Sequence, residues 1–230
     1  MERICEPELM DDALQAQAYA EADFSESDQA MVEWIVDLFG DGPGATGLGA
    51  RIVDLGCGPG NITFRLASAC PGAAVLGIDG AGRMLAIAEA RRQADPRWLA
   101  AVSFRLAVLP SAELEQAPLA AAFSAVVSNS LLHHLHDPQV FWQAVRQMAA
   151  PGAAVYVQDL RRPPTPEAVE ALVAAEMVGA PEVLRSDYRN SLYAAFTPQE
   201  VEMQLRVAGI GCLEARERGE RYLEVWGRLV

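Results

Sequence analysis

The most informative stretch of this chain is Asp54-Leu55-Gly56-Cys57-Gly58-Pro59-Gly60. It follows the apolar run Arg51-Ile52-Val53, which is typical of a strand, and precedes residues 61–66, which are typical of the first turns of a helix. Three glycines in five residues let the chain bend sharply and let a ligand approach the backbone closely, because glycine has no Cβ. We therefore predict a binding turn. Its backbone N–H groups and the Asp54 carboxylate would meet a ligand that carries both an amino group and a carboxylate.

The glycine spacing separates two classes of nucleotide-binding fold. The dinucleotide fingerprint G-x-G-x-x-G, counted from Gly56 and Gly58, needs its third glycine at position 61, where this chain has Asn61. Gly60 comes one residue early. The stretch instead resembles motif I of the class I methyltransferases that use S-adenosylmethionine (SAM). The resemblance implies that Asp54, Gly56, Gly58 and Gly60 belong to a SAM-binding site.

Length and hydropathy predict a single globular unit. The chain has 230 residues, half of them apolar, which fits one α/β domain with some length left for a lid. No apolar run reaches the roughly 18–20 residues that span a bilayer. The first seven residues contain no apolar segment typical of a signal peptide. We expect a cytoplasmic protein with no membrane partner.

The charge balance argues against nucleic acid as a partner. The net charge is −13, and the 18 basic residues are all arginine, scattered or in pairs rather than gathered in a stripe. Affinity for a phosphate backbone needs clustered cations, so we expect a small-molecule substrate and a monomer or homodimer. The four cysteines have no metal-site spacing, and we expect free thiols without a catalytic role.

Strands and helices alternate after residue 50, which predicts a mostly parallel sheet with helices on both faces. The candidate strands are apolar and unbroken, at 51–55, 74–78, 102–106, 124–128 and 153–158, with a closing pair at 209–213 and 222–229. The candidate helices are 62–69, 83–93, 112–116 and 138–148. The resemblance implies a Rossmann-like, doubly wound α/β sheet of seven strands. The last strand would be antiparallel and inserted between its neighbours.

The glycine-rich segment 41–49 predicts a linker. It divides an N-terminal helical lid, residues 1–49, from a SAM-binding core, residues 50–230. A helical cap insertion is expected at about 160–196, before the closing strands.

The turns after the second and third strands are expected to hold the nucleoside. Asp79 ends the second strand, where a carboxylate can accept hydrogen bonds from both ribose hydroxyls, with Gly80 beside it. The alternative is that Asp79 caps the helix that follows. The resemblance implies that Met84 packs on the adenine, although it could equally be helix core. Ala107 and Val108 lie where the family contacts the adenine edge. The acidic residue common there is absent, so backbone groups or apolar contacts would have to replace it.

A second motif follows the fourth strand, in Ser128-Asn129-Ser130-Leu131-Leu132-His133-His134-Leu135-His136-Asp137-Pro138. It resembles motif IV of small-molecule methyltransferases of the ubiquinone/menaquinone-biosynthesis-like group, in its His-His and its Asp-Pro. The resemblance implies that Asn129 and Ser130 lie beside the methionine part of SAM. His133 is the first candidate for a base, and the alternative is that the histidines pack and cap the turn. We expect no metal, because neighbouring rings on a turn should diverge and no third ligand stands nearby in the sequence.

Two segments are candidates for the acceptor side. The N-terminal helix resembles a lid in which a tyrosine reaches the SAM carboxylate, and that role falls on Tyr19. The alternative is a surface helix whose Tyr19 packs on the sheet. Arg161, Tyr188, Arg189 and Tyr193 could receive a polar or anionic acceptor, or they could lie on a solvated surface.

The sequence therefore predicts a SAM-dependent methyltransferase that acts on a small molecule and yields S-adenosylhomocysteine (SAH). Methyl transfer from a sulfonium mainly needs two aligned reactants and a dry site, so a general base is optional. Two alternatives stay open: a SAM- or SAH-binding protein without transferase activity, and other chemistry on a SAM-like ligand.

Overall fold

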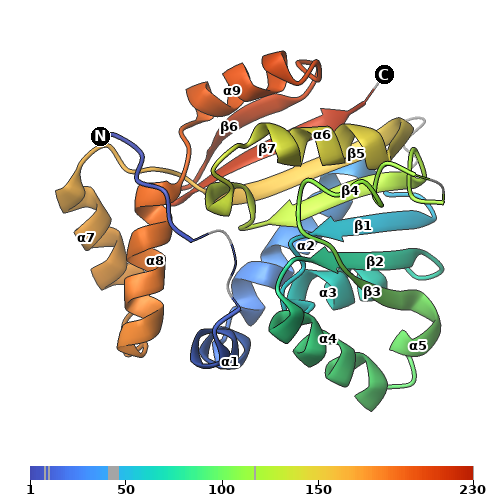
Figure 1. Cartoon of the computed structure of the whole chain (residues 1–230), viewed down its shortest axis with the longest axis horizontal. Coiled ribbons are helices and arrows are strands. Elements are labelled where there is room, and N and C mark those ends of the chain that lie inside the picture. The colour runs from blue at the N-terminus through green and yellow to red at the C-terminus, as the bar shows by residue number, and fades with distance from the viewer. Residues whose placement is uncertain (8, 10, 41–46, 117, 230) are drawn as a thin grey trace.

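The centre of the molecule is a seven-stranded sheet in the order β3-β2-β1-β4-β5-β7-β6 (Figure 1). The structure is a computed structural model that describes residues 1–7, 9, 11–40, 47–116 and 118–229. The strands are β1 (Arg51–Leu55), β2 (Ala74–Asp79), β3 (Val102–Leu106), β4 (Phe123–Asn129), β5 (Ala149–Leu160), β6 (Glu214–Arg218) and β7 (Tyr222–Arg228). β7 runs antiparallel between β5 and β6, as predicted, and β1 to β5 run parallel to one another.

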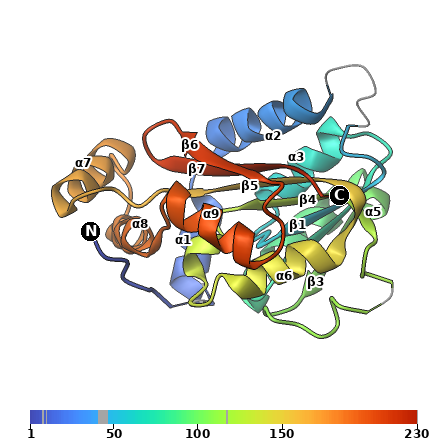
Figure 2. The same cartoon turned by 90° about the horizontal axis from the view of Figure 1, so that it is seen from above.

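Helices cover both faces of this sheet. They are α1 (Ala13–Glu21), α2 (Ser25–Gly40), α3 (Asn61–Ala69), α4 (Gly82–Ala94), α5 (Trp98–Ala101), α6 (Gln139–Met148), α7 (Pro166–Glu176), α8 (Glu182–Ala194) and α9 (Pro198–Val207), with a 3-10 turn η1 (Leu132–His134). Figure 2 shows α2 and α3 on one side of the sheet and α6 and α9 on the other. The doubly wound arrangement is confirmed.

The central strands are buried on both faces, which explains their unbroken apolar sequence. In β1, Val53 and Leu55 pack in the core beneath α6 and α9, whereas Ile52 packs in the core beneath α2 and α3. In β4, Val126 and Val127 divide in the same way. Successive side chains of a strand point to opposite faces, so a strand between two helical layers is mostly apolar, and a polar side chain in it, such as Asp54, is buried as well.

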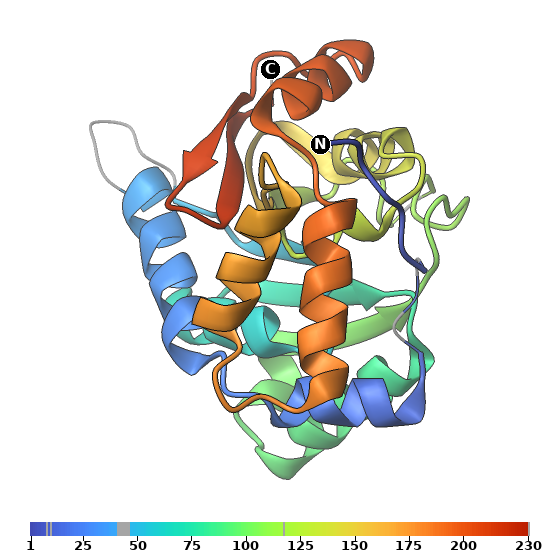
Figure 3. The ribbon, with the colours of Figure 1, turned by 90° about the vertical axis from the view of Figure 1, so that its left-hand side faces the viewer.

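A third group of helices lies beyond the carboxyl ends of the parallel strands. α7 and α8 follow β5, and α1 packs beside α8 and α4 (Figures 1 and 3). The N-terminal segment runs along α8 before it reaches α1 (Figure 3). Arg3 fixes its start by donating to the carbonyl oxygens of His133 and Leu135, at 2.8 and 2.9 Å, and the Ile4 N–H donates to the Tyr193 carbonyl at 3.0 Å. The N-terminal segment and these helices thus gather at the edge where the parallel strands end.

Several predicted boundaries are wrong. Residues 209–213 form turns, and the edge strand begins only at Glu214. Ile210 and Leu213 are apolar because they pack into the core, while β6 itself is the charged run Glu214-Ala215-Arg216-Glu217-Arg218. A charged edge strand is easily mistaken for a loop. The predicted helix at 112–116 is a set of turns, and the short helix α5 was not expected.

The predicted division at 41–49 lies mostly on residues 41–46, which are outside the described part of the chain. Within residues 1–40, α2 packs on the sheet through Met31, Val32 and Ile35. The part of this segment that lies over the strand ends is therefore α1 and the residues before it. None of the described helices is both long and apolar enough to cross a membrane.

Candidate active site

The glycine turn after β1 has the backbone shape that its sequence predicts. Gly56, Gly58 and Gly60 have φ angles of 73°, 51° and 86°, in the left-handed region that favours glycine. A Cβ on Gly56 would lie 2.7 Å from the Cβ of Leu131, so this position also needs the missing side chain. A Cβ on Gly58 would meet nothing within 4 Å. Gly58 therefore borders open space at the mouth of the turn.

The N–H groups of this turn are already used inside the protein. Those of Gly56 and Cys57 donate to the Ile78 carbonyl at 2.8 and 3.1 Å, and that of Gly58 donates to Asp79 Oδ2 at 2.7 Å. The Gly60 N–H donates to the Cys57 carbonyl at 2.9 Å. The prediction that these groups meet the ligand is therefore wrong. They tie the end of β1 to the end of β2, and side chains are left to contact a ligand.

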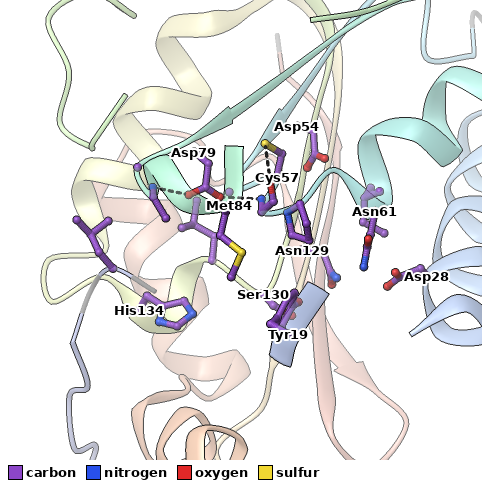
Figure 4. Close-up of a pocket in the computed structure, with 18 residues that line it drawn as sticks. Tyr19, Asp28, Asp54, Cys57, Asn61, Asp79, Met84, Asn129, Ser130 and His134 are labelled. Carbon is purple, nitrogen blue, oxygen red and sulfur yellow. Dashed lines mark hydrogen bonds between the residues drawn. The ribbon is translucent and has the colours of Figure 1, made fainter. Parts of the chain in front are cut away.

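Two adjoining hollows lie over this turn. We call the first the polar hollow. It is lined by Leu9, Tyr19, Asp28, Asp54, Gly56, Cys57, Gly58, Pro59, Asn61, Ile62, Asp79, Gly80, Ala81, Met84, Asn129, Ser130, Leu131 and His134 (Figure 4). We call the second the apolar hollow, and it is lined by Leu9, Leu55, Gly56, Ile78, Asp79, Gly80, Ala107, Val108, Leu109, Leu131 and Leu135. Asp79 and Gly80 belong to both, so they stand where the hollows meet.

Most residues predicted for the cofactor line one of these hollows. The polar hollow contains nine of them: Tyr19, Asp54, Gly56, Gly58, Asp79, Gly80, Met84, Asn129 and Ser130. Ala107 and Val108 line the apolar hollow. Gly60 lines neither, and it forms the N-cap of α3. The sequence thus located the right turns, and the structure brings them together, while the role of each residue stays a prediction.

The polar hollow contains two buried carboxylates with unpartnered oxygens. Asp54 is 1% exposed; its Oδ2 accepts from Thr63 Oγ1 at 2.6 Å, and its Oδ1 has no hydrogen-bond partner. Burial raises the pKa of Asp54 to about 7, with a smaller contribution from Asp79. Asp28 is 6% exposed, and its Oδ2 also lacks a hydrogen-bond partner. Burial raises the pKa of Asp28 to about 6, although the positive charge of Arg65 acts to lower it. Such a site favours a cation.

Asp79 is held differently from these two. Its Oδ2 accepts from the Gly58 N–H and its Oδ1 from the Ala81 N–H, both at 2.7 Å (Figure 4). The helix-capping alternative is wrong, because Ala81 is the N-cap residue of α4 and its side chain makes no capping hydrogen bond. Burial nevertheless raises the pKa of Asp79 above its usual value. Each carboxylate oxygen keeps a second lone pair for a ligand.

The histidine pair after β4 forms a compact cluster with the N-terminal segment. The rings of His133 and His134 lie 4.2 Å apart, and Glu6 Oε1 is 3.4 Å from His133 Nε2 and 3.0 Å from His134 Nδ1. His133 Nδ1 lies 2.5 Å from Asp159 Oδ1. The expectation of diverging rings with no third ligand is wrong, because donor atoms of Glu6, His133 and His134 lie within 4.8 Å of one another, which is close enough to hold a metal ion.

The two histidines differ in what they face. His133 is 3% exposed and lines neither hollow, whereas His134 lines the polar hollow. Burial opposes a charged His133 ring, but Asp159 and Glu6 outweigh it and raise the pKa of His133. The pKa of Glu6 is lowered in spite of its burial, because both histidines favour its charged form. Of the pair, His134 is therefore the one that a bound ligand would meet.

The residues predicted for the acceptor are engaged elsewhere. Arg161 forms an ion pair with Glu217 at 2.9 Å, and Arg189 forms one with Glu170 at 2.7 Å. Tyr188 and Tyr193 pack against the small apolar cluster between α7, α8 and β5. None of these four predicted residues lines either hollow.

Sequence reasoning missed Asp28, although a signal was present. Asp28, Met31, Val32 and Ile35 are spaced i, i+3, i+4 and i+7, and all four are buried. An acidic residue within an apolar helical stripe must be buried with the stripe. Glu6 gave no such signal, because its contact with the histidines joins residues more than 120 positions apart in the chain.

The chain is similar in sequence to known methyltransferases. Residues 53–155 match the methyltransferase domain family. The chain is 30% identical over 120 residues to the mitochondrial ubiquinone biosynthesis O-methyltransferase of Homo sapiens, which covers 52% of this chain and 31% of that protein. It is 34% identical over 144 residues to trans-aconitate 2-methyltransferase of Variovorax paradoxus, which covers 60% of this chain and 51% of that protein. Residues 53–155, which include the glycine turn and the motif after β4, are thus similar to a methyltransferase domain.

A solved structure confirms the fold over nearly the whole length of this chain. A putative SAM-dependent methyltransferase from Methanococcus maripaludis superposes with a TM-score of 0.67, covering 99% of this chain and 98% of that one, at 17% identity. An identity this low establishes the fold alone. The chain spans about a third of the human relative and about half of the bacterial one. These comparisons leave the acceptor unidentified.

Proposed function

We propose that this protein transfers a methyl group from SAM to a small-molecule acceptor and that the two hollows hold SAM. The observation that carries the proposal is the order in which apolar and polar parts of the site follow one another. An apolar hollow is followed by a carboxylate, Asp79, at the junction, and then by a polar hollow with buried carboxylates. SAM has the same order of parts: a flat apolar base, a ribose diol, and a cationic sulfonium with an amino-acid tail.

The residues present fit each part of that ligand. The base would lie in the apolar hollow between Ala107, Val108 and Leu131. These side chains can pack on the flat faces of the adenine without an acidic residue. The diol would donate to Asp79 at the free lone pairs of its oxygens. The cationic end would lie in the polar hollow, near Asp54, where an unpartnered carboxylate oxygen is available. Among the residues that line the polar hollow, none is lysine or arginine.

The same geometry opposes a dinucleotide. A pyrophosphate needs free N–H groups at the glycine turn, and here those of Gly56, Cys57, Gly58 and Gly60 are donated inside the protein. Asp28, Asp54 and Asp79 would also repel its charge. A sulfonium compound meets neither obstacle.

The chemistry that SAM supplies when bound is an activated methyl group. An acceptor lone pair forms the new bond to the methyl carbon while the carbon–sulfur bond breaks, and SAH leaves. The chain's task is to align the two molecules and to exclude water. Leu9 and Tyr19, from the N-terminal segment and α1, line the site from the side opposite the sheet, so we propose that this segment acts as its lid. His134 is the ionisable group placed to take a proton from a phenolic or similar acceptor.

Calorimetry tests the cofactor, and turnover tests the reaction. SAM and SAH should each bind with one site per chain, while NAD should not bind. SAH should then accumulate when the protein and SAM are incubated with pools of small metabolites. SAH binding without turnover in any pool would favour the alternative of a binding protein. Binding of NAD in place of SAH would contradict the proposed site.

A further inference from the structure

We propose that Asp28 of α2 recognises the α-ammonium group of the amino-acid tail of SAM and SAH. This inference rests on the proposed function, and it assigns a recognition role to a residue outside the glycine turn and the motif after β4.

Asp28 is a buried carboxylate that its partners in the protein, the Asn61 side chain and Arg65, satisfy only in part. Its Oδ2 has no hydrogen bond, and the nearest cation, Arg65 Nη1, is 3.8 Å away. Arg65 instead donates to the carbonyl oxygens of Asn61 and Ser25, at 3.0 and 3.4 Å. A carboxylate taken out of water is costly unless a donor satisfies it. Its retention on the buried stripe of α2 therefore points to a ligand that supplies the donor.

The position of Asp28 identifies which part of the ligand this is. Asp28 lines the polar hollow but not the apolar hollow, and it lies beside Asn61, on the side of the hollow opposite His134 (Figure 4). The junction of the hollows at Asp79 fixes the ribose, so the far side of the polar hollow receives the amino-acid tail. Only the ammonium of that tail can donate hydrogen bonds.

Asp54 offers the second half of the same contact. Its unpartnered Oδ1 also belongs to the polar hollow, and the charges of Asp54 and Asp28 act on each other. An ammonium group has three N–H donors, which is enough to satisfy both oxygens with one to spare. Charge-assisted bonds of this kind are among the stronger ones in proteins.

The test pairs a variant with a ligand that lacks the group in question. SAH and its desamino analogue, in which CH₂ replaces the ammonium-bearing carbon, are titrated into wild type and Asp28→Asn by calorimetry. Wild type should bind SAH about 10- to 100-fold more tightly than the analogue. In Asp28→Asn that ratio should shrink to within about threefold, with the analogue's affinity nearly unchanged. Asp37→Asn is the matched control, because Asp37 lies exposed on the same helix and should leave the ratio unaltered.

The other outcomes overturn the inference in distinguishable ways. A full SAH preference in Asp28→Asn would show that the ammonium is held elsewhere. If a folded variant bound both ligands more weakly by the same factor, Asp28 would shape the hollow without contacting the ammonium group. Failure of wild type to bind either ligand would remove the proposed function and this inference together. Circular dichroism should show Asp28→Asn to be folded, since the amide removes a buried charge.

Discussion

Binding of SAH near neutral pH should release protons. In the free protein, Asp54 has a pKa of about 7 and Asp28 one of about 6, both raised by burial. At pH 6.5 about three quarters of Asp54 and about a quarter of Asp28 carry a proton, which makes about one proton in all. An ammonium placed between the two carboxylates favours their charged forms and lowers both pKa values. Binding should therefore expel up to about one proton at pH 6.5 and only about a tenth of one at pH 8.

The release is measured by calorimetry in two buffers of different ionisation enthalpy, since the proton taken up by the buffer adds its own heat. The observed enthalpy should differ between the buffers at pH 6.5 and nearly agree at pH 8. Asp54→Asn should reduce the release at pH 6.5 to about a quarter of a proton, which is the share of Asp28. Identical enthalpies in both buffers at pH 6.5, or proton uptake, would refute the reasoning that buried acids receive the ligand's cation.

Three further changes test the site and its frame. Asp79→Ala should weaken SAH binding by about 1–3 kcal/mol by calorimetry, because the ribose loses its acceptor, and unchanged affinity would discredit that assignment. Gly56→Ala should lower the free energy of unfolding, measured in urea, by about 1–3 kcal/mol more than Gly58→Ala does. Both glycines have positive φ, but only at Gly56 would the new Cβ clash with a side chain, that of Leu131. His133→Ala should destabilise the fold by about 2–4 kcal/mol, because the buried Asp159 carboxylate loses its histidine partner and keeps only backbone N–H donors. His134→Ala should cost less than about 1 kcal/mol, and equal losses would contradict the different burial of the two rings.

Local chemistry made the sheet and the cofactor turns predictable. The strands at 51–55 and 102–106 begin and end as expected. β1 is buried at four of its five positions, whereas the edge strand β3 is largely exposed and was predicted from the alternation of strands and helices. Gly56 and Asp79 were found because a strand end in this fold places its next residues at the ligand site. The strand order came from the family resemblance, since periodicity does not encode which strands are neighbours.

What the sequence did not reveal depends on long-range contacts. Glu6 meets His133 and His134 only because the N-terminal segment is drawn across η1 by Arg3. The hydrogen bonds that consume the N–H groups of the glycine turn go to the end of β2, a partner that spacing cannot show. The side chain of Arg189 was predicted to face an acceptor, yet it pairs with a neighbouring helix. Pairing choices among exposed charges leave no periodic trace in the chain.

The central claim is that SAM occupies the two hollows with its ribose at Asp79, and a crystal structure of the complex with SAH tests it most directly. The account predicts the adenine between Ala107 and Val108, both ribose hydroxyls within hydrogen-bond distance of Asp79, and the ammonium beside Asp28 and Asp54. Density for SAH elsewhere, or a ribose that leaves Asp79 without contact, would contradict it.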